Sequence, residues 1–244
     1  MLEFIKKVLR LGPLRLLYEP MHKLYRLYSV PHRRRLLRKR GPEVLADLVH
    51  IAQKHSIPVF AAYGTLLGFV REKGFIAHDE DMDFGILPNA MTPQELLRIL
   101  LERESGFEVR FIYKYRECVS EFKVVYKGIP IDFFFFDRDG EHFLSHLLFY
   151  LPGKKYAEPN ANTIREVTFA AVNRLKKINV FGIEFPIPEN EVEVLESLYG
   201  PTWRTPDKKW SDDKRPQIEE SDELGYLITL DEAYLLEHKC ETRA

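Results

Sequence analysis

The residues best placed to do chemistry are three aspartates at alternating positions, Asp79, Asp81 and Asp83, which a strand-like run follows. Successive side chains of an extended segment point to opposite faces, so Asp81 and Asp83 share one face about 6.5 to 7 Å apart. Carboxylates this close repel each other unless protons or a cation neutralise them. A lone Asp-x-Asp is more often a solvated acidic turn. A hard ion such as Mg²⁺ or Mn²⁺ takes oxygen ligands together with phosphates, so the pattern also predicts a metal site, with Asp79 and His78 as accessory candidates.

The residues before these acids have the pattern of a strand, a glycine turn and a helix start, and this pattern favours phosphate. Val59–Tyr63 is strand-like, and Gly64 and Thr65 precede apolar residues at helical spacing. Thr65 can cap the helix, while Gly64 lets the backbone approach a ligand with its free amide hydrogens. Gly68 costs about 1 kcal/mol relative to alanine, so either close packing or a ligand explains it. Arg71 either reaches a phosphate or is a solvated helix end.

The whole stretch YGTLLGFVREKGFIAHDEDMDFGI, residues 63–86, resembles the signature of the LicD and fukutin family. Members carry Gly-Thr-Leu-Leu-Gly, a nearby Arg, a Gly-Phe-Ile segment and an acid-rich Asp-x-Asp block. Many relatives have Trp or Pro before the acids, where this chain has Ala77 and His78. The phosphate cradle and acidic strand also resemble the start of the nucleotidyltransferase fold of the DNA polymerase β superfamily.

The superfamily resemblance implies a third carboxylate on a neighbouring strand, and Asp132 is the candidate. It lies inside GIPIDFFFFD, a run that is typical of a strand. An aspartate buried there needs water, a donor or a metal. We expect the metal, and the alternative is a backbone amide at a strand mouth. Asp137 and Asp139, next to Gly140, indicate a hairpin turn without chemistry.

The family resemblance implies a reaction: a phosphorylated alcohol, such as phosphocholine or ribitol phosphate, moves from a CDP-activated donor to a hydroxyl of a glycan or lipid-linked glycan, and CMP leaves. A metal at Asp81, Asp83 and Asp132 would neutralise developing charge, and Asp132 or Asp79 would accept the proton. Two alternatives stay open. One is a nucleotidyltransferase that consumes NTP and releases pyrophosphate, and the other is a non-catalytic scaffold of the same fold.

Residues 1–40 form a basic arm with a local charge of +10, which leaves −11 for the rest of a chain whose total is −1. Pro13, Pro20 and Pro31 are expected to break it into short segments, the first an amphipathic helix. Such a pattern suits an anionic membrane, although packing on protein stays open. Nucleic acid is not expected, because the remainder is acidic and a base-stacking motif is lacking. Two distant cysteines are compatible with a reducing compartment, so we expect a cytoplasmic protein, peripheral on the inner membrane face.

The order of elements predicts an α+β fold, a nucleotidyltransferase-like mixed sheet covered by helices, with the basic helical arm in front. We expect the arm at 1–40, the catalytic domain at 41–212, and an acidic tail with a short helix at 213–244. Trp203 and Trp210 lie near basic residues and either stack on a sugar or base or anchor the tail. Helices are expected at 42–55, 92–104 and 189–199, strands at 107–113, 118–126, 129–136 and 141–149, a loop at 151–167, and a hairpin around Gly182.

Overall fold

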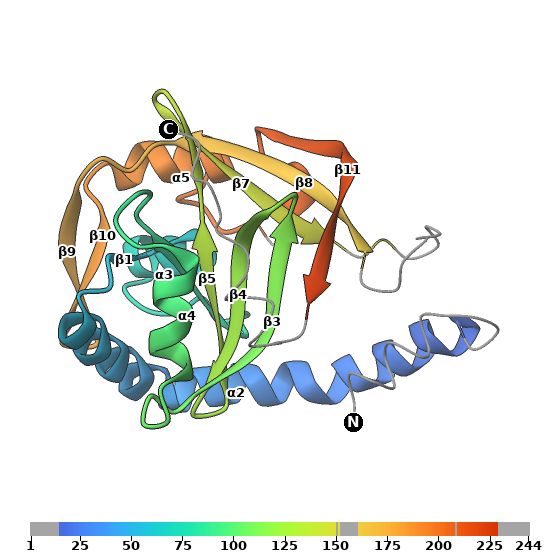
Figure 1. Cartoon of the computed structure of the whole chain (residues 1–244), viewed down its shortest axis with the longest axis horizontal. Helices are drawn as coiled ribbons and strands as arrows, with labels where there is room; N and C mark the ends of the chain where they lie inside the picture. The colour runs from blue at the N-terminus through green and yellow to red at the C-terminus, as the bar shows by residue number, and fades with distance from the viewer. Residues whose placement is uncertain (1–14, 150, 152–160, 208, 229–244) are drawn as a thin grey trace.

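A nine-stranded mixed sheet forms the centre of the protein in a computed structural model that describes residues 15–149, 151, 161–207 and 209–228 (Figure 1). Its strands follow the order β1-β2-β5-β4-β3-β11-β8-β7-β6. Their bounds are β1 Val59–Ala61, β2 Met82–Ile86, β3 Phe107–Tyr115, β4 Cys118–Tyr126, β5 Ile129–Phe135, β6 Asp137–Asp139, β7 His142–Phe149, β8 Ala161–Ala170 and β11 Ile218–Ile228. The predicted α+β class with a helix-covered mixed sheet is confirmed.

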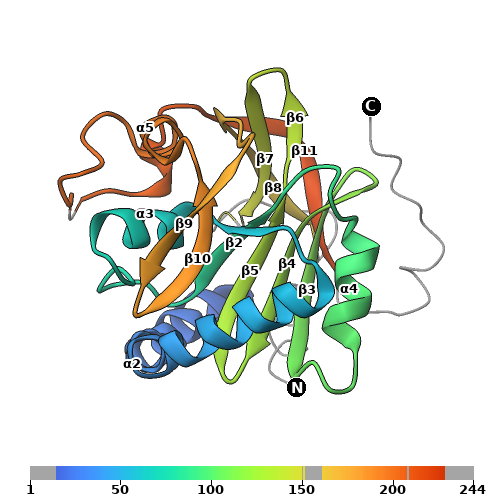
Figure 2. The ribbon, with the colours of Figure 1, turned by 90° about the vertical axis from the view of Figure 1, so that its left-hand side faces the viewer.

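Four α-helices surround this sheet, as Figures 1 and 2 show for the described residues. They are α2 Arg15–His55, α3 Tyr63–Arg71, α4 Pro93–Leu101 and α5 Glu191–Tyr199. Helix α2 packs against β5, α3 against β2, α4 against β3 and α5 against β8. Among the described residues, no helix is long and apolar enough to cross a membrane.

Strands β2 and β5 are parallel neighbours, and every other pairing in the sheet is antiparallel. Aromatic side chains hold this part together: Phe84 of β2 and Phe133 of β5 are fully buried and their ring centres lie 6.1 Å apart. Aromatic and β-branched residues fit the pleated surface and remove large apolar areas from water. The sequence-predicted strands at 107–113, 118–126, 129–136 and 141–149 are confirmed with small shifts of their ends.

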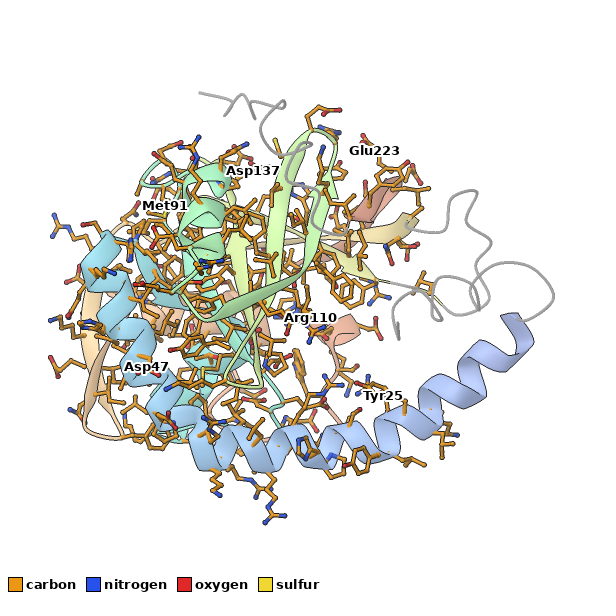
Figure 3. All side chains as sticks on the ribbon, turned by 60° about the horizontal axis from the view of Figure 1, so that its bottom comes forward. Tyr25, Asp47, Met91, Arg110, Asp137 and Glu223 are labelled. Atoms are coloured by element: carbon orange, nitrogen blue, oxygen red, sulfur yellow. The ribbon has the colours of Figure 1, made fainter. Side chains whose placement is uncertain are left out.

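Helix α2 corrects two expectations. It runs unbroken from Arg15 to His55, so Pro20 and Pro31 do not divide it, and no separate helix begins at Pro42. Its direction turns between the part that carries Tyr25 and the part that carries Asp47 (Figure 3). Pro42 lies between them, and a proline inside a helix removes one hydrogen bond and bends the axis. Pro13 and the amphipathic helix expected before it lie outside the described residues.

The remaining local patterns were mostly correct. Thr92 and Glu95 form the expected capping box at the start of α4, and Gly200 ends α5. The hairpin around Gly182 is present as β9 Leu175–Val180 and β10 Ile183–Pro188. The expected DRDG turn is shifted: Asp137–Asp139 form the short strand β6, and Gly140 and Glu141 make the turn to β7.

Two strands were missed by the sequence analysis. β8 occupies 161–170, where a loop was expected, and β11 occupies 218–228, within the expected acidic tail. β11 pairs with both β3 and β8, so it joins the two parts of the large sheet. Part of the expected loop, 152–160, and the helix expected after residue 230 lie outside the described residues.

Candidate active site

Asp83 and Asp132 are direct partners in the parallel pairing of β2 with β5. Partners in register point to the same face of a sheet, so the two carboxyl groups face each other across one strand spacing. Asp132 is buried, and its Oδ1 has no hydrogen-bond partner among the described residues. Burial raises the pKa of Asp132 to about 6, although the neighbouring Lys123 lowers it; the charge of Asp81 raises it further. The third acid on a neighbouring strand is therefore where the sequence predicted it.

The N-terminus of α3 meets the same carboxylates. β1 runs antiparallel to β2, so the end of β1 lies beside the start of β2, and the helix begins there. The amide of Gly64 donates to Oδ2 of Asp83 at 3.1 Å, and the amide of Asp83 donates to the hydroxyl of Thr65 at 2.8 Å. Thr65 is not the helix cap, because the helix starts two residues earlier and the hydroxyl is committed to Asp83. Tyr63, the first helical residue, has a strained φ of 40°.

A methyl group at Gly64 would lie 3.1 Å from Oδ2 of Asp83 and 3.8 Å from both oxygens of Asp79. The missing side chain therefore opens a space between an amide and two carboxylates. A phosphate with its counter-cation needs such a space, since the backbone supplies donors there and the acids supply ligands for a cation.

Asp79 and Asp81 lie next to this pair, on the segment that leads into β2. Burial and then Asp81 raise the pKa of Asp79 to about 7, and burial and then Asp81 raise the pKa of Asp83 well above its ordinary value. Mutual repulsion of this kind shows that the four carboxyl groups form one electrostatic cluster. His78 is exposed, and its backbone carbonyl accepts from Nε of Arg34 at 2.9 Å. This contact uses the backbone of His78 and not its imidazole.

Gly68 and Arg71 have structural partners. A methyl group at Gly68 would lie 2.6 Å from the carbonyl oxygen of Gly74, which explains the glycine by close packing of α3 on the following turn. Nη1 of Arg71 donates to the carbonyl of Trp203 at 3.0 Å, and its Nε pairs with Glu72 at 2.8 Å. Arg71 still lowers the pKa of Asp79, so its charge reaches the cluster. A phosphate-binding role for either residue stays a prediction.

Two charged residues of β4 were missed by the sequence analysis. Nζ of Lys123 lies 2.8 Å from Oδ2 of Asp132 and 3.8 Å from Oε1 of Glu121. Burial and then Asp132 raise the pKa of Glu121 to about 8. The signal was present in the sequence: Glu121 and Lys123 alternate with apolar residues in a buried strand, which places both on the face that also carries Asp132.

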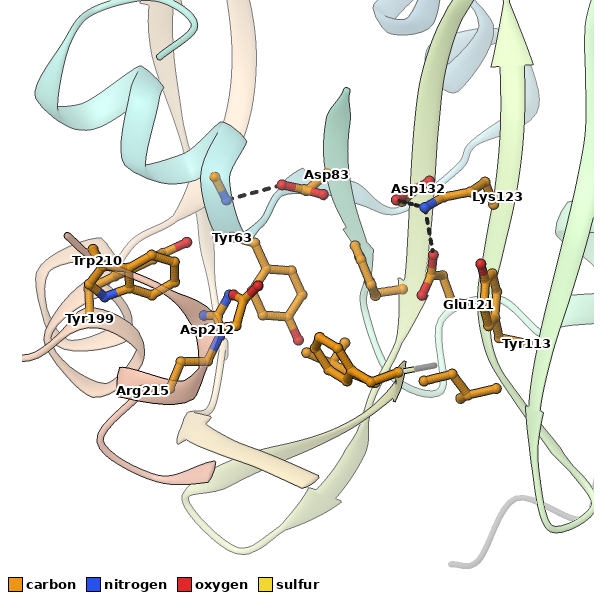
Figure 4. Close-up of a pocket in the computed structure, with 15 residues that line it drawn as sticks. Tyr63, Asp83, Tyr113, Glu121, Lys123, Asp132, Tyr199, Trp210, Asp212 and Arg215 are labelled. Atoms are coloured by element: carbon orange, nitrogen blue, oxygen red, sulfur yellow. Dashed lines mark hydrogen bonds and ion pairs between the residues drawn. The ribbon is translucent and has the colours of Figure 1, made fainter. Parts of the chain in front are cut away.

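Some of these residues line one cavity of about 330 Å³, shown in Figure 4, whereas Asp79, Asp81, Gly68 and Arg71 are not among its lining residues. That volume lies within the usual range for small-molecule sites. One wall of the cavity, the carboxylate wall, consists of Gly64, Asp83, Asp132, Lys123 and Glu121. Tyr63 separates them from a second wall, formed by Tyr199, Trp210, Asp212 and Arg215.

Comparison with known proteins finds the same family that the motif suggested. The family model described as LicD/FKTN/FKRP, nucleotidyltransferase domain, matches residues 56–190, more than half of the chain. The chain belongs to the LicD/FKTN/FKRP family. The match contains β1, α3, β2, β4 and β5, and therefore every residue of the carboxylate wall.

Curated relatives of this LicD/FKTN/FKRP chain are fukutins. The mouse protein named ribitol-5-phosphate transferase FKTN is 25% identical over 178 residues, which cover 72% of this chain and 35% of the mouse protein. The human protein of the same name is 22% identical over 182 residues, covering 73% and 36%. The chain thus spans about a third of the length of these relatives.

Two facing acids of the carboxylate wall suit a magnesium ion that completes its shell with other ligands. Among the residues that the structure describes, no three His, Cys, Asp or Glu side chains are already gathered as a metal cage. Mg²⁺ usually takes only one or two carboxylates and completes its shell with waters and substrate phosphates. The facing pair Asp83 and Asp132, with the unpartnered Oδ1 of Asp132, matches that requirement.

Proposed function

We propose that this protein is a metal-dependent phosphotransferase that moves a phosphorylated alcohol from a CDP-activated donor to a glycan hydroxyl and releases CMP. One observation carries the proposal: the amide of Gly64 and the carboxylates of Asp83 and Asp132 line one cavity. A helix N-terminus and paired acids together suit a donor diphosphate with its cation. The fukutin relatives support ribitol phosphate as the first alcohol to test.

The transfer forms one bond and breaks another. The acceptor hydroxyl attacks the phosphorus that carries the alcohol, the bond from this phosphorus to the bridging oxygen breaks, and CMP leaves with that oxygen. Asp132 or Asp79 accepts the hydroxyl proton. Asp79 suits this role because its pKa of about 7 lies near neutral pH, and Asp132 because its Oδ1 is unpartnered. The positive N-terminus of α3 at Gly64 attracts the donor diphosphate.

We propose that Asp81, Asp83 and Asp132 hold Mg²⁺ or Mn²⁺. When bound, the ion supplies positive charge where the phosphate oxygens become more negative. Lys123 places a second positive charge on the same side, 2.8 Å from Asp132. Glu121, whose pKa lies near 8, keeps its proton at neutral pH and adds no further repulsion.

A donor screen tests the proposed function. The full chain is incubated with Mg²⁺, a glycan acceptor and either CDP-ribitol, CDP-choline or the four NTPs, and the products are separated. We expect CMP from one CDP-alcohol, and loss of this signal in EDTA. Pyrophosphate from an NTP would instead identify a nucleotidyltransferase. A folded protein that releases neither product from any donor would support a scaffold.

We also propose that the N-terminal part of α2 contacts an anionic membrane on the cytoplasmic side. Leu24, Leu27 and Tyr28 are spaced as one helix face and are 69%, 69% and 76% exposed. This part of α2 extends beyond the large sheet (Figure 1). Exposed basic residues accompany the apolar face: Lys23, Arg35, Arg38 and Lys39. Apolar and basic residues together suit a headgroup region. Arg26, Arg33 and Arg34 instead lie within 4 Å of Glu80, so the arm also packs on the domain.

A further inference from the structure

The second wall of the cavity lies beyond the part of the chain that the family model matches. Tyr199 ends α5, and Trp210, Asp212 and Arg215 follow it, whereas the match stops at residue 190. In Figure 4 these side chains lie on the opposite side of Tyr63 from Asp132 and Lys123. Nothing in the carboxylate chemistry described above uses them.

Arg215 is the centre of this wall. Its guanidinium carbon lies 5.1 Å from the ring centre of Tyr63, and 5.2 Å from those of Tyr199 and Trp210. Its side chain is only 6% exposed. Contacts of a guanidinium with several aromatic rings hold it in a fixed orientation.

The hydrogen bonds of Arg215 are incomplete. Nη2 donates to Oδ1 of Asp212 at 2.7 Å, but Nε and Nη1 have no partner among the described residues. The indole nitrogen of Trp210 is also buried without a partner in that part of the chain. Buried donors without acceptors are costly, most of all on a charged group.

A purely structural role accounts for part of this arrangement only. Stacking of Arg215 between rings would fasten the segment 210–215 onto Tyr63 and α5. It would not explain why two residues that line a cavity each keep a buried N–H donor without an acceptor among the described residues. A ligand rich in acceptor oxygens satisfies them, and phosphate is the ligand group that arginine binds best.

We propose that Arg215 and Trp210 form an oxyanion-binding subsite for a nucleoside diphosphate, in which Arg215 holds the phosphate that stays with the nucleoside. The inference rests on the proposed function, since a diphosphate held at Gly64 and Asp83 lies between the two walls of one cavity. The carboxylate wall then contacts the phosphate that is attacked, and the second wall, which contains Arg215, binds the leaving CMP. Trp210 and Tyr199 contact the nucleoside through their rings.

Trp210 itself reports on this subsite. The chain has two tryptophans, so in a Trp203→Phe background the fluorescence comes from Trp210 alone. CDP, UDP, ADP and GDP are titrated into this full-length variant with Mg²⁺. We expect a saturable change of fluorescence with at least one of them, and about tenfold or weaker binding after Arg215→Met.

Arg204→Met is the matched control. Arg204 is also an arginine over an aromatic ring, 4.3 Å from the ring centre of Trp203 in the parent chain and over the phenylalanine that replaces it in the test background, but its side chain is 57% exposed and it does not line the cavity. Its loss should change the dissociation constant by less than about twofold. Circular dichroism melts of both variants show whether each is folded.

Asp212→Asn keeps the test decisive if Arg215→Met does not fold. Asp212 accepts from Nη2 and leaves Nε and Nη1 to the ligand, but its negative charge lines the same cavity and repels a phosphate, so removal of this charge should tighten binding by about threefold. Loss of folding cannot produce such a gain. The inference is wrong if none of the four nucleotides changes the Trp210 signal, if folded Arg215→Met binds as tightly as the parent, or if Asp212→Asn does not bind more tightly. Nucleotide binding that depends on Arg215, without CMP release in the donor screen, would retain this inference and reject the proposed function.

Discussion

The surroundings of Asp83 disfavour the ionised form of its carboxyl group unless a cation binds beside it. Burial and the charges of Asp81 and Asp132 raise its pKa well above the ordinary value, while its Oδ2 accepts from the Gly64 amide. A group whose charge is disfavoured by its neighbours, yet kept in place by a backbone donor, is typical of a functional site. The stability and the activity of the protein should therefore respond oppositely to its replacement.

We predict that Asp83→Asn and Asp132→Asn each lower CMP release by about a hundredfold or more, since each removes a carboxylate that the cation and phosphate need. Asp83→Asn should also raise the melting temperature in EDTA, because it removes a repelled charge. Asp139→Asn, at the exposed end of β6, is the control and should change neither quantity. Wild-type activity in the Asp83 variant would exclude this residue from the reaction.

Alanine substitutions at the two glycines of α3 should have different effects, one on activity and the other on stability. Gly64→Ala places a methyl group 3.1 Å from Asp83 Oδ2, so we expect strong loss of CMP release with little change in melting temperature. Gly68→Ala places it 2.6 Å from a backbone oxygen, so we expect destabilisation by about 1 to 3 kcal/mol from overpacking. Thermal melts and activity assays of both proteins check the contrast. Equal effects of the two changes on stability would show that Gly64 is also a packing residue.

The carboxylate cluster should make stability depend on pH. In the unfolded chain these acids lose their protons near pH 4, whereas folded Asp79 keeps its proton up to about pH 7 and Glu121 up to about pH 8. The folded state therefore binds more protons in this window, and its stability falls as pH rises through it. In EDTA we expect a melting temperature several degrees higher at about pH 5.5 than at about pH 8.

Mg²⁺ should reduce this difference, because a cation replaces the protons as the neutralising charge. Asp79→Asn and Glu121→Gln should reduce it as well, in the absence of metal. A melting temperature that rises with pH over the same window in EDTA would contradict the assignment of these shifted groups.

The sequence predicted the acids and missed their partners for a physical reason. Asp83, Asp132 and Gly64 stand in local patterns that a helix start and a strand impose, and the structure brings these three residues together. Lys123 and Arg215 reach the cavity only through pairing and packing with distant segments. Alternation along β4 puts Lys123 on the same face as Glu121, but it does not tell which residue that face meets unless the pairing of the strands is already known.

At the scale of elements, the helices and strands with a clear pattern of apolar residues could be predicted from the sequence. β5 and α4 have strong apolar patterns and were predicted. β11 has the sequence IEESDELGYLI, whose charges suggested a tail, yet it lies between β3 and β8. Its backbone pairs on both sides, so hydrogen bonds rather than apolar side chains place much of this strand.

Helix α2 gives the element-scale prediction. The expected boundary at residue 40 would make the arm separable, but Leu37, only 1% exposed, belongs to the main core. We predict that Leu37→Ala lowers the free energy of unfolding by about 2 to 5 kcal/mol. Leu27→Ala, on the exposed face of the same helix, should change it by less than about 0.5 kcal/mol. Urea unfolding of both variants measures the difference, and a neutral Leu37→Ala would mean that the arm folds apart from the domain.

At the scale of the whole molecule, positive and negative charge are separated, and exposed apolar side chains accompany the positive part. The first 40 residues carry +10 and the rest −11, and the exposed apolar face of α2 lies within the basic part. An anionic bilayer attracts the basic residues and buries the apolar side chains. Salt screens the attraction of the charges but does not weaken the burial of the apolar side chains. We predict that the full chain co-sediments with phosphatidylserine vesicles, less with phosphatidylcholine vesicles, and less as salt rises.

Replacing Leu24, Leu27 and Tyr28 together by serine should abolish this co-sedimentation at physiological salt while the melting temperature stays unchanged, because these side chains are exposed. Leu101→Ser, at an exposed position of α4 outside the basic part, is the control and should retain binding. Sedimentation of the protein without vesicles separates membrane binding from contact of the basic arm with the acidic body of a second copy. If the serine variant binds vesicles as wild type does, the α2 face is not the membrane contact, and the local charge of residues 1–40 must find its partner on protein.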